Sequence, residues 1–449
     1  MTGASDPICA LITPGGYAAI AMLRISGKGA IELTARHFRP ATKLLEARSH
    51  SIVHGYFTDA EGRDIDEVLA YIFRKPHSYT GEDLVELSCH GNPDLAKRIL
   101  QTLLISCRPA NPGEFTLRAY LNGKLDLNQA EAVNDLIHAK AHRAEKAALM
   151  QLQGQLSKFL QQLLESILHL RMRCELAIDF SDQDLPLPEN QELRHELEQV
   201  LEAAKALAAT GNQGKLIREG IKICLSGAPN AGKSSLFNAF LKQNRALVTP
   251  HPGTTRDYLE ESISLNGFPV IFYDTAGLRD DPDSIEAQGI AKSLELMHSA
   301  DLILYLIDAT LPDNHALPDL EPELLHKTLF VYSKMDLLPA GKNIPQAAIP
   351  CSALLPDGLK QASEAILHHL MLHDLSPDEP LVTNARQLSA LHKSIAFLDE
   401  ALLAHSENRG YEFIAFELGS AGAALEEILG IISSDDLLGE IFSNFCIGK

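Results

Sequence analysis

The chain is 449 residues long, which is too long for one hydrophobic core, so we expect about three domains. Its 59 acidic and 39 basic side chains give a formal net charge of −20, which argues against a broad nucleic-acid-binding surface. It has no apolar run of about 18 residues and no signal-like N-terminus, and its seven cysteines form no Cys-x-x-Cys pair. We therefore expect a soluble cytoplasmic protein with reduced thiols, no membrane anchor and no zinc site.

Residues 1–120 alternate short apolar runs with turn residues. Strands are predicted at residues 8–12, 19–25, 52–57, 68–73 and 84–87, and helices at 30–38 and 93–105. The polar stretches 80–83 and 88–92 are predicted turns. This pattern predicts an α+β domain.

Residues 121–215 carry a helical pattern instead. Asp126 followed three positions later by Gln129 is a variant of the capping box that begins a helix. Apolar residues then recur at helical spacing, and a helix rich in Glu, Leu and Ala follows Pro186 and Pro188. We expect long amphipathic helices that end near the glycines at 211–214, where we place a domain boundary.

A phosphate-binding pattern follows this boundary. The apolar residues 221–225 predict a buried strand, which runs into Gly227-x-x-x-x-Gly232-Lys233-Ser234 and then into a predicted helix at 235–241. Glycines let backbone N–H groups converge on phosphate oxygens, and the helix N-terminus adds its positive end. Lys233 would reach the terminal phosphates, and the Ser234 hydroxyl would ligate Mg²⁺.

Further loops after predicted strands complete a nucleotide site, at residues 253–257, 274–277, 333–336 and 351–353. Asp274 can hold Mg²⁺ through water, Thr255 can add a hydroxyl ligand, and the Gly277 N–H can sense a γ-phosphate. Asp336 can accept from both N1 and N2 of guanine, a pattern that adenine does not offer. Strands alternating with helices predict a doubly wound α/β domain at 216–375, which resembles a TRAFAC-class GTPase.

Two positions depart from the usual GTPase pattern. Ser333 stands where the guanine loop usually has Asn, so its hydroxyl can replace only part of the hydrogen bonding of an amide. Leu278 stands where Ras-like proteins have a water-orienting Gln, and a leucine side chain cannot orient water. The hydrolytic group must therefore come from elsewhere in the chain.

The last segment, residues 376–449, is predicted to be helical with a break near 408–410. It ends with the sequence Phe-Cys-Ile-Gly-Lys. Cys446 is fourth from the end, as in a prenylation box, but Gly448 and Lys449 do not fit that motif, so we do not predict lipidation.

Three blocks of sequence resemble the MnmE (TrmE) family of tRNA-modification GTPases. They are Asn-Pro-Gly-Glu-Phe at 111–115 with Leu-Asn-Gly-Lys-Leu-Asp at 121–126, the loop Gly-Ala-Pro-Asn-Ala-Gly-Lys-Ser at 227–234, and the terminus Phe-Cys-Ile-Gly-Lys. The resemblance covers essentially the whole chain. It implies an N-terminal α+β dimerisation and tetrahydrofolate-binding domain at 1–120, an inserted Ras-like G domain at 216–375, and a discontinuous helical-bundle domain from 121–215 and 376–449.

The resemblance also implies an activity. The chain would be a K⁺-dependent GTP hydrolase that forms a homodimer and joins a flavin-dependent partner of MnmG type in a heterotetramer. Together they would add an aminomethyl or carboxymethylaminomethyl group to C5 of the wobble uridine of certain tRNAs. The tRNA would be bound mainly by the partner. The one-carbon donor would be a 5-formyl or methylene tetrahydrofolate. A different class stays open, a G-protein switch in ribosome assembly, which would share the GTPase loops without needing the N-terminal segment and the tail.

Site residues are implied in the same way. Contacts to GTP are expected at Asn230, Ala231, Gly232, Lys233, Ser234, Ser235, Thr249, Pro250, His251, Pro252, Gly253, Thr254, Thr255, Asp274, Thr275, Ala276, Gly277, Ser333, Lys334, Met335, Asp336, Ser352, Ala353 and Leu354. The Mg²⁺ ligands would be Ser234 and Thr255, and the K⁺ ligands Asn230, Thr249, His251 and Thr254. The folate contacts would be Arg24, Glu86, Lys124 and Lys449. We expect Arg24 and Lys124 to pair with the glutamate tail of the folate, and Glu86 to hydrogen-bond its pterin.

Two residues are candidates for catalysis. In the family a carboxylate a dozen residues beyond the first Asp of Asp-Thr-Ala-Gly replaces the missing Gln, and here that residue is Glu286. Cys446 is a candidate nucleophile for C6 of the uracil, because attack there activates C5. A terminal thiol can equally be structural, and no neighbouring residue in the sequence is an evident base.

Overall fold

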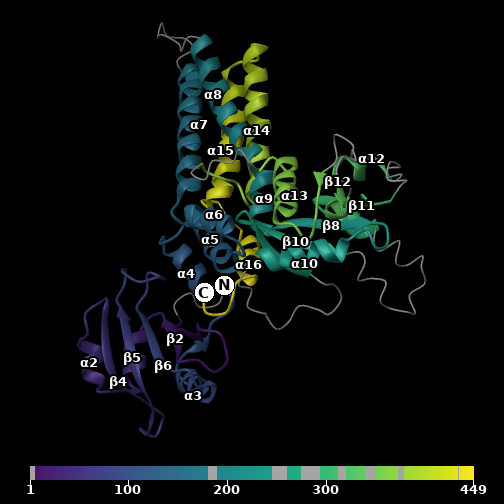
Figure 1. Cartoon of the computed structure of the whole chain (residues 1–449). Helices are drawn as coiled ribbons and strands as arrows, with labels where there is room; N and C mark the ends of the chain where they lie inside the picture. The colour runs from purple at the N-terminus through teal and green to yellow at the C-terminus, as the bar shows by residue number, and fades with distance from the viewer. Residues whose placement is uncertain are drawn as a thin grey trace. The chain divides into compact units, whose positions relative to one another are not determined.

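The computed structural model describes residues 6–179, 190–244, 260–274, 294–311, 320–338, 349–372, 379–432 and 434–449. The chain forms two compact units, of which the first combines residues Met1–Asn134 with Leu425–Lys449 and the second is Asp135–Ala424. Helices α5 (Leu127–His138) and α15 (Tyr411–Leu429) contain the points where the chain passes from one unit to the other. Figure 1 shows the elements of both units coloured along the chain.

The first unit is built on a seven-stranded sheet with the order β3-β4-β5-β6-β2-β1-β7. Neighbouring strands are antiparallel except β1 and β7, which are parallel. The strands are β1 (Ile8–Leu11), β2 (Ile20–Ser26), β3 (Phe38–Arg39), β4 (Ser51–Thr58), β5 (Asp64–Phe73), β6 (Leu84–His90) and β7 (Arg108–Pro109). Because residues of a strand point alternately to opposite faces, one face of this sheet supplies the core.

Helices α1 (Ala30–Ala35) and α3 (Pro93–Leu103) cover that core face, where they pack on Leu23, Val85 and their neighbours. Helix α2 (Ala41–Glu46) follows β3. The opposite face carries exposed apolar side chains such as Ile52 and Leu69. The predicted α+β fold of this segment is confirmed.

The two ends of the chain meet within the first unit. Helix α4 (Glu114–Leu121) contacts α16 (Asp435–Ser443), and a small core joins the start of α5 to the tail through Leu127, Ala130, Leu438, Phe442 and Phe445. Gly113, at the start of α4, has φ +67° and lies so close to Phe442 that a Cβ would be 2.7 Å from its carbonyl oxygen. The tail is therefore packed as part of this unit.

The second unit contains a helical part and a sheet. Its further helices are α6 (His142–Leu152), α7 (Gln155–Asp179), α8 (Asn190–Ala209), α9 (Gly211–Glu219) and α14 (Ala385–Ser406). Figure 1 shows α7, α8, α14 and α15 running alongside one another. The close approach of α7 to α15 uses Gly419, where a Cβ would be 3.2 Å from the Arg171 guanidinium. The predicted break between α14 and α15 lies at residues 407–410, as expected.

The sheet of the second unit has six strands in the order β13-β12-β11-β8-β10-β9. All pairs are parallel except β9 with β10. The strands are β8 (Ile221–Gly227), β9 (Glu260–Leu265), β10 (Phe268–Asp274), β11 (Leu302–Asp308), β12 (Thr328–Ser333) and β13 (Ile349–Pro350). A short 3₁₀ turn, η2 (Met335–Leu337), follows β12.

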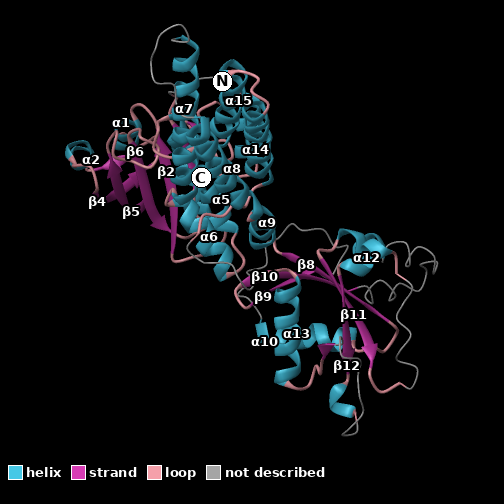
Figure 2. Ribbon diagram, turned by 90° about the horizontal axis from the view of Figure 1, so that it is seen from above, coloured by secondary structure: helices cyan, strands magenta, loops and turns pink. Residues whose placement is uncertain are grey.

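Helices lie on both faces of this sheet, as Figure 2 shows. Ile223 and Leu225 of β8 pack in the core that includes α10 (Lys233–Asn244) and α13 (Pro356–His369). Cys224, between them, packs in a second core with Met297 and with Leu324 of α12 (Pro322–His326). The predicted doubly wound α/β fold is therefore confirmed.

One local prediction was wrong. Residues 88–90 belong to strand β6 rather than to a turn, because Cys89 and His90 continue the ladder opposite Ala21 and Ile20. The helix predicted to end near the glycines at 211–214 ends at Ala209, and Gly211 and Gly214 lie in the next helix, α9. Their role is close packing, since a Cβ on Gly214 would be 2.1 Å from the Val382 carbonyl oxygen. The domain boundaries themselves stay a prediction.

Candidate functional site

The phosphate-binding pattern forms a loop between β8 and α10. Gly227 has φ +135° and a Cβ there would be 2.4 Å from the Leu306 carbonyl oxygen, so only glycine fits. Gly232 has φ +95° and Asn230 has φ +63°, both left-handed. Lys233 is 8% exposed, and its Nζ donates to the carbonyl oxygens of Gly227 and Ala228 at 2.9 Å each. This curled backbone before a helix N-terminus has the geometry of a phosphate cradle, with Ser234 and Ser235 in the first turn of α10.

The predicted guanine-reading loop is joined to that cradle through Ser333. The Ser333 hydroxyl lies 2.6 Å from the Ala231 carbonyl oxygen and 3.2 Å from that of Ile307, and it donates toward both. The side chain is 7% exposed, so this link is protected from water. The serine that stands in place of the usual asparagine is thus hydrogen-bonded directly to the phosphate loop.

Asp336, the predicted guanine reader, lies in η2, and Met335 N donates to the Cys351 carbonyl oxygen. The Ser352 hydroxyl donates to Asp336 Oδ1 at 2.6 Å, and Leu354 N donates to the same Ser352 oxygen at 3.2 Å. The loop of Ser352, Ala353 and Leu354 therefore orients the carboxylate. This contact brings the two predicted loops together, while their role in binding guanine stays a prediction.

Sequence reasoning missed one member of this group, Asp308 at the end of β11. Lys334 Nζ forms an ion pair with Asp308 Oδ2 at 2.6 Å. Burial raises the pKa of the Asp308 carboxyl, but hydrogen bonds from Lys334 and Thr310 outweigh it and lower the pKa below its ordinary value. A carboxylate at the carboxyl end of a parallel strand beside the phosphate-loop strand is the signal that could have identified it.

Several predicted GTP and ion contacts lie outside the described residues. They are Thr249, Pro250, His251, Pro252, Gly253, Thr254, Thr255, Thr275, Ala276, Gly277 and Glu286. Asp274 is the last residue of β10, in register with Leu225 of β8, one strand from the phosphate loop.

A second group of predicted site residues lies in the first unit, on β2, β6 and the tail. Arg24 and Glu86 are cross-strand neighbours, and Arg24 Nε and Nη2 lie 2.9 and 2.8 Å from Glu86 Oε1. The Arg24 guanidinium also lies 5.2 Å from the ring centre of Tyr79 and 5.4 Å from that of Phe115. The arginine is thus fixed between a carboxylate and two aromatic rings.

Lys449 belongs to the same group. Burial and the positive charge of Arg24 lower the pKa of the Lys449 ammonium, although Glu86 and Cys446 act in the opposite direction. Its backbone carbonyl accepts from Phe115 N at 3.2 Å. Three of the four predicted folate contacts, Arg24, Glu86 and Lys449, are therefore brought together.

The fourth, Lys124, is exposed, and its Nζ donates to the Pro76 carbonyl oxygen at 3.2 Å. The structure gives no direct contact between Lys124 and Arg24 within the described part of the chain. Cys446 has an exposed side chain, whereas the other six cysteines are buried, and none of the seven, which all lie in the described residues, is in a disulfide.

The Asn-Pro-Gly-Glu-Phe block at 111–115 supports this site. Glu114 is 7% exposed and accepts from Arg108 Nη1 at 2.7 Å, Asn111 N at 2.9 Å and Arg118 Nη2 at 3.0 Å. Burial raises the pKa of Glu114, but these partners outweigh it and lower the pKa. Arg118 in turn donates to Glu82 at 3.1 Å, so the buried network ties α4 to the loop before β6.

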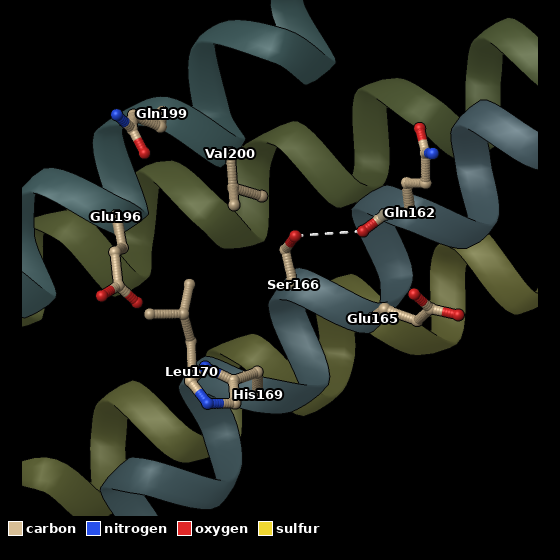
Figure 3. Close-up of a pocket in the computed structure, with 8 residues that line it drawn as sticks. All are labelled: Gln162, Glu165, Ser166, His169, Leu170, Glu196, Gln199 and Val200. Atoms are coloured by element: carbon tan, nitrogen blue, oxygen red, sulfur yellow. Dashed lines mark hydrogen bonds between the residues drawn. The ribbon is translucent and has the colours of Figure 1, made fainter.

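A groove of about 440 Å³ between α7 and α8 lies apart from both groups in sequence (Figure 3). It is lined by polar side chains that include Glu165, His169 and Glu196, and the Ser166 hydroxyl donates to the Gln162 carbonyl oxygen at 3.0 Å. None of the residues that line it is a predicted site residue.

In the described portion of the structure, no helix has both the length and the apolar character needed to cross a membrane.

The doubly wound sheet, the phosphate cradle and the adjoining Ser333–Asp336 loop define a P-loop GTPase that carries a separate α+β unit. Comparison with known families identifies which one. Residues 7–124 match the family described as GTP-binding protein TrmE N-terminus, and residues 127–446 match the MnmE helical domain.

Full-length relatives agree with that match. The tRNA modification GTPase MnmE of Aquifex aeolicus is 40% identical over 450 residues, 99% of this chain and 100% of that protein. The tRNA modification GTPase MnmE of Opitutus terrae is 42% identical over 457 residues, 99% of each chain. A solved structure, the G domain of the T. maritima FeoB iron transporter, aligns with 24% identity and a TM-score of 0.24 over 33% of this chain and 98% of that one. The chain belongs to the MnmE family of tRNA modification GTPases.

Proposed function

We propose that this chain is a K⁺-dependent GTPase that works with a flavoprotein of MnmG type to modify C5 of the wobble uridine in certain tRNAs. An aminomethyl or carboxymethylaminomethyl group would be installed with a one-carbon unit from a tetrahydrofolate. The observation that supports this proposal is the group of Arg24, Glu86 and Lys449, which would form a second site in a GTPase of this family. A G-protein switch alone would not need it.

The charge of that group suits an anionic ligand. Two cations, Arg24 and Lys449, share one carboxylate, Glu86, and the ammonium is destabilised by burial and by Arg24. A carboxylate of a folate glutamate tail would relieve that repulsion through charge-assisted hydrogen bonds. The rings of Tyr79 and Phe115 offer flat apolar surface next to the guanidinium. When bound, the tetrahydrofolate supplies the one-carbon unit, while these residues hold and orient it.

The nucleotide site would work through a second set of residues. Lys233 would contact the phosphates and Asp336 the guanine, and Ser234 with Thr255 would hold Mg²⁺. Asn230, in a left-handed conformation within the phosphate loop, would join Thr249, His251 and Thr254 around K⁺. A cation there can supply the positive charge that an arginine finger supplies in other GTPases.

The partners follow from the charge of the chain and from the family. A net charge of −20 suits a protein that leaves most tRNA binding to its partner. We propose a homodimer that joins the flavoprotein in a heterotetramer in the cytoplasm. Two G domains would meet across the nucleotide in the transition state.

One experiment tests the modification activity directly. A strain that lacks the gene is complemented with the wild-type chain, and wobble nucleosides from total tRNA are analysed by mass spectrometry. The modified uridine should return with the wild-type chain and not with Lys233→Ala. Normal nucleosides in the uncomplemented strain, together with a ribosome-assembly defect, would instead support the switch.

A second experiment tests the hydrolytic proposal. GTP turnover should be faster in K⁺ than in Na⁺ at fixed ionic strength, and Glu286→Ala should reduce turnover at least about tenfold while GTP still binds. A tenfold loss corresponds to about 1.4 kcal/mol of transition-state stabilisation. Equal rates in the two salts would contradict the K⁺ site, and an unchanged turnover number would make Glu286 a solvated surface charge.

A further inference from the structure

Asp308 ends strand β11, which lies between the phosphate-loop strand β8 and the guanine-loop strand β12. It is in register with Ser333, the first residue of the guanine loop. Its carboxylate is only 9% exposed. A charged group this well buried needs partners, and both of its oxygens have them.

The first oxygen is held locally. Asp308 Oδ1 accepts from Thr310 N at 2.9 Å and from the Thr310 hydroxyl at 2.6 Å. These bonds form a tight turn at the end of the strand, so the carboxylate has a fixed orientation before any other group binds it. The second oxygen, Oδ2, accepts from Lys334 Nζ at 2.6 Å.

The backbone of Lys334 is held in place as well as its ammonium group. Lys334 has φ +59°, a left-handed conformation that is uncommon for a non-glycine residue. The preceding residue, Ser333, is bound to the Ala231 carbonyl oxygen of the phosphate loop. Two positions further on, Asp336 is bound to Ser352. The lysine stem is therefore anchored at both ends, between the loop that holds phosphates and the residue that reads the base.

Resting on the GTP site proposed above, we infer that Asp308 is a positioning residue, which holds the Lys334 stem as a wall against which the face of the guanine base packs. An aliphatic lysine stem can cover an apolar surface while its ammonium stays with a polar partner. A flexible lysine would lose rotamer entropy on binding the nucleotide, whereas a lysine already held by Asp308 loses less. Asp308 thus affects how tightly the nucleotide is held and not which base is chosen, because Asp336 reads the base edge.

Asp308→Asn tests this in the full-length chain. Dissociation constants and dissociation rates are measured by fluorescence with N-methylanthraniloyl-GDP and its inosine counterpart. The amide cannot pair with the ammonium as strongly, so we expect about tenfold weaker binding, mainly through faster dissociation. The ratio of guanine to inosine affinity should stay as in the wild type, whereas Asp336→Asn should change it.

A double-mutant cycle separates positioning from a general structural effect. If Asp308 acts through Lys334, then Asp308→Asn should have little further effect on affinity when Lys334→Ala is already present. Equal losses in both backgrounds would overturn the proposal, as would unchanged GDP binding by Asp308→Asn. Asp301→Asn is the matched control, because Asp301 precedes the same strand and its carboxylate accepts from Lys222 N at 2.8 Å.

A milder variant keeps the test decisive if Asp308→Asn folds poorly. Thr310→Val changes an exposed residue and removes the hydroxyl that fixes Asp308 Oδ1, while the Lys334 ion pair can still form. We expect two- to threefold faster GDP dissociation in the wild-type background. In the Lys334→Ala background, the GDP dissociation rate should stay nearly unchanged. An effect of the same size in both backgrounds would contradict the inference.

Discussion

Arg24 Nη1, on strand β2, donates to the carbonyl oxygen of Gly448, although 424 positions separate the two residues in the sequence. The distance is 3.3 Å, and the same guanidinium pairs with Glu86. One arginine therefore joins the N-terminal sheet to the last turn of the chain. This contact is what places Lys449 beside the Arg24–Glu86 pair.

Backbone hydrogen bonds reinforce that contact. Phe115 N donates to the Lys449 carbonyl oxygen, and Gly113 N donates to that of Cys446. Phe445 is buried against Phe442, with ring centres 5.1 Å apart. A terminal segment is ordered only when it is tied down in this way. If a folate binds as proposed, the terminus would form a wall of its site.

Gly448→Ala should displace this wall. Gly448 has φ +101°, and a Cβ would lie 3.0 Å from both Ile12 Cγ2 and the Leu11 carbonyl oxygen. A side chain there combines backbone strain of about 1–2 kcal/mol with steric overlap. We expect faster hydrogen exchange of residues 445–449 and reduced tRNA modification, with unchanged GTP hydrolysis.

Gly439→Ala is the control for that prediction. Gly439 lies in helix α16, and no atom lies within 4 Å of a Cβ placed there. An alanine in a helix is favoured over glycine by about 0.5–1 kcal/mol, so this variant should modify tRNA normally. Normal modification by Gly448→Ala as well would show that the position of the tail does not matter for activity.

Cys446→Ser separates the two roles proposed for the terminal thiol. Serine keeps the size and polarity of the side chain but removes the thiolate, and the exposed position of Cys446 imposes no packing demand on sulfur. If the thiolate attacks C6 of the uracil, modification should stop while folate binding and GTP hydrolysis continue. Modification at the normal rate, measured by nucleoside analysis, would leave Cys446 as part of the wall only.

Glu114→Gln should destabilise the first unit by about 3 kcal/mol, because it leaves Arg108 and Arg118 around a neutral buried amide. The folded-state pKa of Glu114 is lowered from the ordinary value of 4.5, so its stabilisation is complete above that pH and is lost as the pH falls through the folded-state pKa. The protection of the α4 amides against hydrogen exchange should therefore change less between pH 7 and pH 4 in the variant than in the wild type. Glu61→Gln, which alters an exposed ion pair with Arg63, is the control and should change exchange little.

The sequence predicted features that depend on neighbouring residues. The phosphate loop was found because its glycines, Lys233 and the flanking strand and helix lie within about 20 consecutive residues, and local spacing determines such geometry. Most strands of both sheets are predicted by their apolar runs, but β3, β7, β9, the start of β5 and the end of β6 are not. That end was missed because Ser88 and His90 are polar, and pairing with β2, not hydropathy, makes them strand.

Contacts between distant segments could not be predicted in the same way. Asp308 and Lys334 lie 26 positions apart, and nothing in the sequence near either residue indicates that they form an ion pair. The pair depends on β11 lying beside β12. The grouping of Arg24 with Lys449 came from family resemblance, not from periodicity. Lys124 was assigned to the same site by resemblance, and its observed hydrogen bond is to Pro76 instead.

Asp336→Asn should shift the base preference from guanine toward xanthine. The Asp336 carboxylate accepts one hydrogen bond from Ser352, and its acceptor atoms match the two N–H donors at N1 and N2 of guanine. An amide presents a donor in place of one acceptor, which suits the carbonyl at C2 of xanthine. We expect GDP affinity to fall at least about 100-fold and XDP affinity to exceed it. Competition of GDP and XDP for a fluorescent nucleotide measures both, with Asp301→Asn as the control, and GDP affinity that survives Asp336→Asn intact would show that another residue reads the base.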